Sequence, residues 1–201
     1  MLGHICGDGT IVRCRPEKGI RTSYSNSEIE LIKGFDFLMK KIFGEVESYL
    51  YNVDISSQVV KTSFTYTKPH YQISYPTIIS YLILSVYDYK YNDKMEFPEF
   101  ILDLDEKARC GFLRALFDDE GYVNEKHKVV RIGMKPFNFM KGVDRTLNSV
   151  GIETKGIRRE KDKMYYIKIY NKKNQILYSK KINFKHPLKK KRLKKLINFI
   201  K

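Results

Sequence analysis

The feature that most constrains the fold of this chain is an internal repeat. Residues 3–11 and 115–123 follow the same order: a small residue, an apolar stretch, an acid, a glycine and a β-favouring pair. The acids of the two copies, Asp8 and Glu120, stand 112 residues apart. Each copy predicts a short helix that ends at the acid and is followed at once by a strand. We therefore expect two similar halves.

The segment after the first copy is expected to form two hairpin-like strand pairs, each followed by a helix. Strands are expected over residues 10–15, 20–26, 45–54 and 59–74. A capping box at residues 27–30 predicts the start of the first helix. Its apolar stripe consists of Ile29, Ile32, Phe35, Leu38 and Ile42. A second helix is expected over residues 77–87.

The segment after the second copy has the same expected order. Strands are expected over residues 122–125, 128–134, 152–160 and 163–171. A helix should begin at Pro136, with the apolar stripe Phe137, Met140, Val143, Leu147 and Val150. Further helices are expected over residues 173–182 and 187–201. The expected fold class is α+β, with two pseudo-symmetric α-β-β-α-β-β-α halves.

The charge of the chain favours a polyanionic partner. There are 38 Lys and Arg residues against 23 Asp and Glu, a net charge of +15 and a pI near 9.6. Such a balance indicates nucleic acid rather than membrane. However, residues 180–201 hold ten basic residues and no acid, so a solubilising basic tail would explain most of the excess. Binding to nucleic acid needs further evidence.

Other compositional features narrow the class of protein. A hydrophobic fraction of 42% and an aromatic fraction of 13% exclude a disordered chain. No run of 18 apolar residues and no signal-peptide pattern is present, so we expect a cytoplasmic protein that does not enter membranes. Three cysteines without a CxxC pair argue against both a disulfide scaffold and a zinc site.

The two copies of the repeat resemble the nine-residue motif of the LAGLIDADG homing endonucleases. Residues 1–9 and 113–121 each align with that motif without a gap. The resemblance covers both halves and is closest to the monomeric, pseudo-twofold branch of the family. It implies a single compact unit, with one half over residues 1–95 and the other over residues 96–201. Two antiparallel sheets would form a DNA-binding saddle, joined by two packed motif helices.

The physical chemistry of the motif agrees with this resemblance. Gly3 and Gly7 stand four residues apart and share one helical face, as do Ala115 and Asp119. Small residues on a face allow two helix backbones to approach closely, so Gly3, Gly7 and Ala115 are expected to pack the motif helices together. The two acids should then converge. A glycine after each acid suits the left-handed turn that ends a helix.

Two converging carboxylates indicate a site for divalent cations. Asp8 and Glu120 are the expected catalytic and metal-binding acids, and the backbone carbonyls of Gly7 and Asp119 could add further oxygen ligands. We expect Mg²⁺, with Mn²⁺ as the alternative, and metal-assisted phosphodiester hydrolysis. Asp119 departs from the small residue that the family has there. His4 is expected to be a core histidine rather than a catalytic one.

The strands should present basic and polar side chains to DNA. We expect Ile11, Thr22, Tyr24, Val130 and Ile132 to face inward, and Arg13, Arg15, Arg21, Ser23, Ser25, Val129 and Arg131 outward. The family lays such a sheet into the major groove, where Arg and Lys contact phosphates or guanine edges. The full set of expected DNA-binding residues is Arg13, Arg15, Arg21, Ser23, Ser25, Lys61, Lys68, Arg131, Arg158, Arg159, Lys161 and Lys168. The alternative is an ordinary solvated surface.

The resemblance also implies a basic residue near the scissile phosphate in each half. In the second half Lys172 follows the last strand and is the expected catalytic lysine. In the first half the matching stretch, residues 71–77, offers none, and Lys61 and Lys68 are the nearest substitutes. The first motif helix is also short, which an upstream start codon or a decaying gene would explain.

Three functions are compatible with these features. The first is site-specific cleavage of double-stranded DNA by a monomeric enzyme. The second is an RNA maturase that binds intron RNA and assists splicing. The third is a DNA-binding regulator that does not cut, against which the retention of both Asp8 and Glu120 argues. The DNA target cannot be inferred from the sequence.

Overall fold

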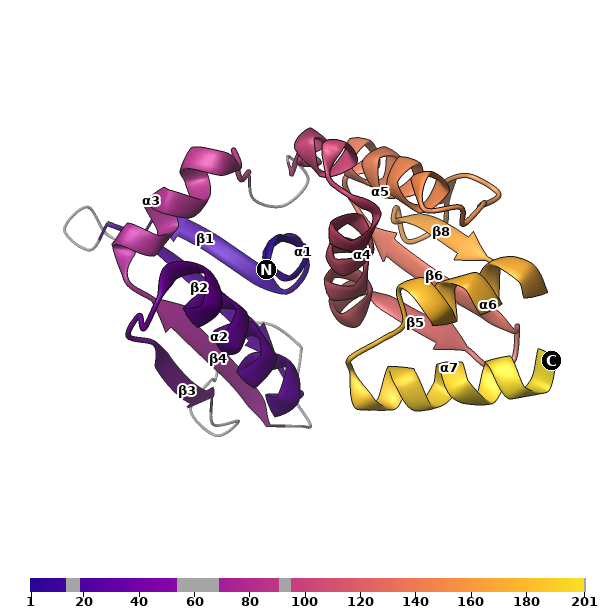
Figure 1. The fold of residues 1–201 in the computed structure, drawn as a ribbon, viewed down its shortest axis with the longest axis horizontal. Helices are drawn as coiled ribbons and strands as arrows, with labels where there is room; N and C mark the ends of the chain where they lie inside the picture. Colours follow the sequence, from indigo (N-terminus) through magenta and orange to yellow (C-terminus); the bar gives the residue numbers. More distant parts are fainter. Residues whose placement is uncertain (14–18, 54–68, 91–94, 201) are drawn as a thin grey trace. The chain divides into compact units, whose positions relative to one another are not determined.

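The computed structural model describes residues 1–13, 19–53, 69–90 and 95–200. Contacts divide the chain into two units: Met1 with Asp8–Val86, and Leu2–Gly7 with Tyr87–Lys201. Each unit contains one four-stranded antiparallel sheet, and the order of strands in the two sheets is equivalent (Figure 1). The expected α+β class and the repeated α-β-β-α-β-β-α order are therefore confirmed.

The first unit is a sheet covered on one face by two helices. Its strands, in spatial order, are β1 (Gly9–Arg13), β2 (Ile20–Asn26), β4 (His70–Tyr75) and β3 (Tyr49–Val53). The helices are α2 (Ile29–Phe43) and α3 (Thr77–Val86). The ring of Phe35 in α2 stacks on Tyr24 at 4.6 Å and meets the edge of Tyr75 at 5.9 Å. These aromatic contacts fix α2 on the sheet.

The second unit repeats this arrangement with more helices around it. Its strands, in spatial order, are β5 (Gly121–Asn124), β6 (Val129–Met134), β8 (Tyr165–Ile169) and β7 (Arg158–Arg159). Its helices are α1 (Leu2–Cys6), the 3₁₀ helix η3 (Glu99–Asp103), α4 (Glu106–Glu120), α5 (Phe137–Ser149), α6 (Lys172–Lys181) and α7 (Pro187–Ile200). Leu113, Ile132 and Phe139 are completely buried between sheet and helices. Figure 1 shows α6 and α7 in orange and yellow beside this sheet.

The predicted stripes of two helices are wrong at one end. In α2 the buried side chains are Leu31, Ile32, Phe35 and Met39, whereas Ile42 in the last turn is 53% exposed. In α5 Phe139 is buried, and Phe137 in the first turn is 40% exposed and packs on the ring of Tyr165. Terminal turns extend past the sheet, so apolar periodicity alone overestimates their burial.

The predicted capping box is also absent. Helix α2 begins after Glu28, whose side chain makes no capping hydrogen bond. The backbone N–H of Glu28 instead donates to Oδ1 of Asn26, 2.9 Å away. An Asx-type turn from the end of β2 thus takes over the role of the Ser27 hydroxyl. In the described part of the chain, no helix is long and apolar enough to cross a bilayer.

Candidate active site

The two repeated acids stand at junctions between a helix and a strand. Asp8 lies between α1 and β1, and Glu120 is the last residue of α4, directly before β5. The left-handed turn expected at the second glycine is wrong, because Gly121 has an extended backbone with φ −86°. Its lack of a side chain has another cause: a Cβ atom there would lie 2.7 Å from the carbonyl oxygen of Phe117.

The small residues of the two motifs bring α1 and α4 into close contact within the second unit. A Cβ atom on Gly3 would lie 2.3 Å from the Phe112 carbonyl oxygen and 2.8 Å from the Cβ of Ala115. A Cβ atom on Gly7 would lie 2.5 Å from Oδ2 of Asp119. Gly7 therefore leaves room for the larger Asp119. Asp8 and Glu120 follow directly after this pair in sequence.

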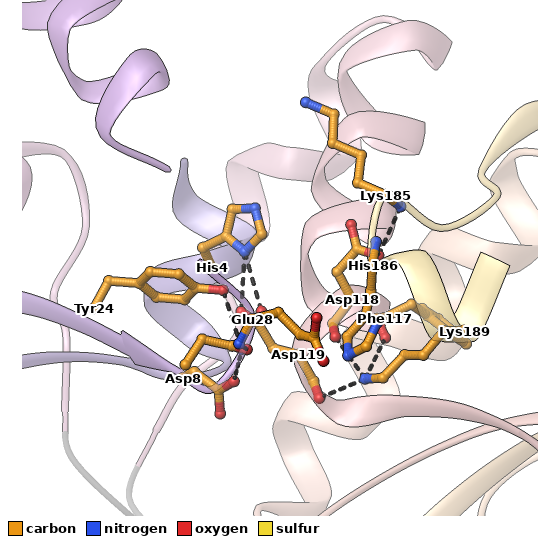
Figure 2. A network of polar contacts seen from close by, with 11 residues as sticks. His4, Asp8, Tyr24, Glu28, Phe117, Asp118, Asp119, Lys185, His186 and Lys189 are labelled. Carbon is orange, nitrogen blue, oxygen red and sulfur yellow. Dashed lines mark hydrogen bonds and ion pairs between the residues drawn. The ribbon is translucent and has the colours of Figure 1, made fainter. Parts of the chain in front are cut away.

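A buried contact between a histidine and a carboxylate joins the two motif helices. Nδ1 of His4 lies 3.1 Å from Oδ2 of Asp119, and the Asp119 side chain is completely buried (Figure 2). A buried carboxylate needs a charged or hydrogen-bonding partner, and His4 supplies one. The aspartate that replaces a small residue in the second motif is therefore matched by the histidine that replaces an apolar residue in the first.

Asp8 has a polar partner that the sequence analysis did not identify. Nδ2 of Asn26, at the end of β2, donates a hydrogen bond of 2.7 Å to Oδ2 of Asp8. The β1–β2 hairpin explains this contact, since Gly9 pairs with Tyr24 and the N–H of Ser25 donates to the carbonyl of Asp8. Asn26 lies one residue beyond Ser25, which pairs with Asp8, so only the observed strand pairing brings the Asn26 amide to the Asp8 carboxylate.

The end of α4 is anchored by the segment that leads into α7. Oδ1 of buried Asp118 accepts hydrogen bonds from the backbone N–H groups of Lys185 and His186, at 2.8 and 2.9 Å (Figure 2). Burial raises the pKa of Asp118 above its ordinary value, although these N–H donors oppose that shift. Asp118 is therefore a structural acid rather than a surface acid.

The ammonium group of Lys189 caps the C-terminal end of α4. Its Nζ lies 2.5 Å from the carbonyl oxygen of Asp118, 2.9 Å from that of Asp119 and 3.4 Å from that of Phe117 (Figure 2). A cation is favourable there because the last carbonyls of a helix have no partner within the helix. In the sequence, Lys189 is one of the basic residues of the C-terminal tail. Only the fold brings it to the end of α4, the helix whose last residue is Glu120.

The candidate donors for a divalent cation are hard oxygen atoms, which suits Mg²⁺ or Mn²⁺. They are the carboxylates of Asp8 and Glu120 and the carbonyls of Gly7 and Asp119. Among the described residues, no three His, Cys, Asp or Glu side chains form a ready-made metal site. Carboxylate oxygens are donors of the kind that Mg²⁺ prefers, whereas the Asp119 carbonyl already receives the Lys189 ammonium group.

The candidate catalytic lysine begins a helix in the second unit. Lys172 is the first residue of α6, and Asn171 before it caps the helix by accepting from the N–H of Asn174 at 2.7 Å. In the first unit the equivalent strand β4 is followed by Pro76 and then by α3, which begins at Thr77. The described first half thus has no lysine at the matching place. Lys61 and Lys68 lie outside the described residues.

The outer face of the first sheet differs in part from the expectation. Thr22 and Tyr24 are completely buried under the helices, so Arg21, Ser23 and Ser25 belong to the opposite face as predicted. Ser23 is nevertheless only 6% exposed, and its hydroxyl accepts a hydrogen bond from Nε2 of Gln72 at 3.4 Å. Arg13 was expected on that face, which is wrong: it lies two residues after the buried Ile11 and therefore shares the helix-covered side of β1. It is exposed only because it ends the strand. Arg15 lies outside the described residues.

The outer face of the second sheet carries a basic cluster that one carboxylate partly neutralises. The register places Tyr122, Arg131 and Lys168 side by side on β5, β6 and β8. Glu160 lies 3.2 Å from Arg131 and 2.6 Å from Lys168, and the guanidinium of Arg131 stacks on Tyr166 at 3.7 Å. The hydrogen bond from Lys168, followed by the charge of Arg131, holds the pKa of Glu160 below its ordinary value despite desolvation.

Other basic residues of this sheet are more open. Arg158 pairs with Tyr166 and so shares the outer face, whereas Arg159 pairs with Tyr165 and lies on the opposite side of edge strand β7. Both arginines and Lys161 are exposed. As expected, Arg131 and Val129 alternate with buried Val130 and Ile132, although Val129 is itself only 4% exposed.

Comparison with known proteins identifies the class. Residues 107–183 match the family model of the LAGLIDADG-like domain. I-DmoI in complex with DNA and Mn is 19% identical, with a TM-score of 0.60 over 90% of this chain and 92% of that chain. I-WcaI bound to its DNA recognition sequence is 18% identical, with a TM-score of 0.60 over 96% of this chain and 83% of that chain. The family match therefore covers most of the second half. The chain as a whole has the fold of LAGLIDADG homing endonucleases, which confirms the resemblance found in the sequence.

Two other relatives are longer than this chain. Full-length DUF199/WhiA from Thermatoga maritima is 16% identical with a TM-score of 0.59, and this chain covers 58% of it. Glutamine–fructose-6-phosphate aminotransferase from Methanocaldococcus jannaschii is 23% identical over 206 residues, which are 17% of that protein. The chain therefore spans only a small part of the curated relative it matches.

Proposed function

We propose that this chain is a site-specific endonuclease for double-stranded DNA, with Asp8 and Glu120 as its catalytic carboxylates. The observation that carries the proposal is the close contact of Gly7 with Asp119. Each of these residues directly precedes one of the two acids, so the contact supports their convergence. Two carboxylates beside each other form a site for divalent cations and phosphate oxygens.

The relatives support the same activity. The I-DmoI structures include complexes with DNA and Mn and with target DNA in the presence of Mg, and the I-WcaI structure contains its DNA recognition sequence. These chains share the fold over nine tenths or more of the present chain. We infer that Mg²⁺ is the physiological ion and that Mn²⁺ can replace it, because the donors are hard oxygens.

The residues of this chain have separable tasks in the proposed reaction. Asp8 and Glu120 would hold the cations, which supply charge neutralisation and an activated water when bound. Asn26 keeps the carboxylate of Asp8 oriented through its amide. Lys172 would stabilise negative charge on one phosphate. Arg21 and Ser25 on one sheet, and Arg158 on the other, would contact the DNA.

The proposal is tested by target selection followed by cleavage assays. Duplexes cut by the wild-type protein with Mg²⁺ are selected from a randomised library and placed in a supercoiled plasmid. We expect Asp8→Asn and Glu120→Gln to abolish double-strand cutting while leaving DNA affinity intact or higher, since each variant removes a charge that repels phosphate. Glu125→Gln, which changes an acid paired with Arg192 at 3.8 Å, is the matched control and should cut normally.

Other outcomes would identify the alternative functions. Full cleavage by Asp8→Asn or Glu120→Gln would contradict the assigned catalytic carboxylates. Tight, sequence-specific binding without cleavage by the wild type would favour the regulator. Preferential binding of structured intron RNA over duplex DNA would favour the maturase. A sedimentation experiment with the bound duplex would test whether one monomer occupies each target.

A further inference from the structure

Lys189 forms an unusual contact at the helix end that carries Glu120. Its ammonium group lies within 3.4 Å of three successive carbonyl oxygens, those of Phe117, Asp118 and Asp119. Figure 2 shows the side chain extended along the end of α4 towards these atoms. Three oxygen atoms converging on one point resemble the ligand arrangement that a small cation prefers. In this structure the cation at that point is the ammonium group of Lys189.

The ammonium group is held there by the fold. Oδ1 of Asp118 binds the backbone N–H groups of Lys185 and His186, which fixes the start of α7 against the last turn of α4. Leu193, Leu196 and Ile197 bury the other end of α7. Lys189 lies in the first turn of the helix, between these two anchors, whereas the next residue, Lys190, is exposed.

The position matters because the Asp119 carbonyl directly precedes Glu120. A divalent ion held by the Glu120 carboxylate could take that carbonyl as a further hard oxygen ligand. With an ammonium group already 2.9 Å away, a second cation on the same oxygen would experience strong repulsion at short range. The two cations therefore compete for one carbonyl.

We propose that the Lys189 ammonium group takes the place of a divalent cation on the Asp119 carbonyl. Lys189 is then a positioning residue: it neutralises the end of α4 and leaves the carboxylate of Glu120 as the metal ligand that α4 supplies in the second half. The inference rests on the proposed function only in treating Glu120 as a metal ligand. It predicts that metal binding and the charge of residue 189 are coupled.

The test is Mn²⁺ binding to the full chain without DNA, measured by isothermal titration calorimetry. Lys189→Met should bind Mn²⁺ more tightly than the wild type by about tenfold, the lower end of the range by which neighbouring groups change metal affinity. Lys189→Arg keeps the charge and should behave like the wild type. Lys190→Met removes a charge from the neighbouring exposed position and should also leave the affinity unchanged. A lysine that only stabilised the fold would not produce a gain.

Thermal unfolding provides a second measurement that is valid for destabilised variants. In EDTA we expect Lys189→Met and Lys189→Gln to melt below the wild type, and Mn²⁺ to raise their melting temperatures more than that of the wild type. Lys189→Gln retains an N–H donor, so its behaviour separates charge from hydrogen bonding. Equal or weaker Mn²⁺ binding, or an equal melting shift, would overturn the inference. DNA cleavage by the wild type is scored separately, so the proposed function can stand or fall on its own.

Discussion

At the residue scale, two acids of the repeated motifs, Asp8 and Asp119, have polar partners that lie outside their own copy of the motif. Asp8 accepts from Asn26, 18 residues later, and the buried Asp119 pairs with His4 of the other copy. The motif alone pointed to Asp8 and Glu120, because each acid precedes a glycine at the end of an apolar stretch. It could not point to Asn26 or Lys189, since those contacts depend on strand register and on where α7 packs.

Asn26→Asp should destabilise the first unit. The new carboxylate can still accept from the N–H of Glu28, but it faces the Asp8 carboxylate instead of donating to it. We expect a loss of about 1–3 kcal/mol, the usual cost of leaving a largely buried polar group without its partner. The measurement is urea unfolding in EDTA, with Asn52→Asp on exposed β3 as the control. If Mg²⁺ restores the stability of Asn26→Asp, a cation binds between the Asp8 carboxylate and the new carboxylate at position 26. An unchanged unfolding free energy in EDTA would contradict the role of Asn26.

At the element scale, close approach of α1 and α4 depends on residues without large side chains. The short helix α1 has five residues, too few to be stable alone, so its structure comes from packing on α4. Sequence periodicity predicted both helices and the facing glycines. It did not predict that Gly7 accommodates the side chain of Asp119, because this needs the axial alignment of the two helices.

Gly3→Ala should be strongly destabilising. The added methyl group would lie 2.3 Å from a backbone oxygen of α4, which cannot move without shifting the helix. Overpacking of this kind costs about 1–3 kcal/mol. Gly111→Ala is the matched control in α4, with no atom within 4 Å of the new Cβ, and should raise stability by roughly 0.5–1 kcal/mol. Chemical denaturation of both variants measures the difference, and equal effects would refute the close helix contact.

The second sheet should show a pH-dependent contribution from Glu160. The pKa of Glu160 is lowered in the folded state, first by the hydrogen bond from Lys168. A lowered pKa stabilises the fold above the unfolded value of 4.5, and this stabilisation is lost as the pH falls through the folded value. Because the group is partly exposed, the contribution is about 0.5 kcal/mol or less. Glu160→Gln should therefore reduce the drop in unfolding free energy between pH 7 and pH 3.

At the scale of the whole molecule, the sequence predicted the number of halves, the order of elements and the equivalence of β4 with β8. These features follow from turn residues and apolar periodicity, which repeat in both halves. The outward position of Arg13 was wrong because Arg13 lies two residues after Ile11 on β1, so both side chains point to the same face of the sheet. The neutralisation of Arg131 and Lys168 by Glu160 could not be predicted either, since it brings together β6, β8 and the turn after β7.

The two strands of a target should be cut at different rates. Lys172 begins α6 in the second half, whereas Thr77 begins α3 in the described first half. Loss of one stabilising donor typically costs 10²–10³-fold in rate. The two DNA strands should therefore be cut at rates that differ by roughly 10²–10³-fold, and a nicked plasmid should accumulate before the linear product. Lys172→Met should suppress the faster nick, while Lys173→Met should not. Linear product without a nicked intermediate would place the catalytic lysine elsewhere.

Helix α1 is encoded at the start of one half and packs within the other. The first half thus gives its N-terminal helix to the second half, as one partner does in a domain swap, but receives no helix in return. A break between Val86 and Tyr87 would therefore not release two self-sufficient pieces. The C-terminal fragment would expose the groove on α4 beside Phe112 and Ala115, and the N-terminal fragment would carry the helix that fills it. The two fragments should reassociate, which makes the chain suited to control by split-protein complementation.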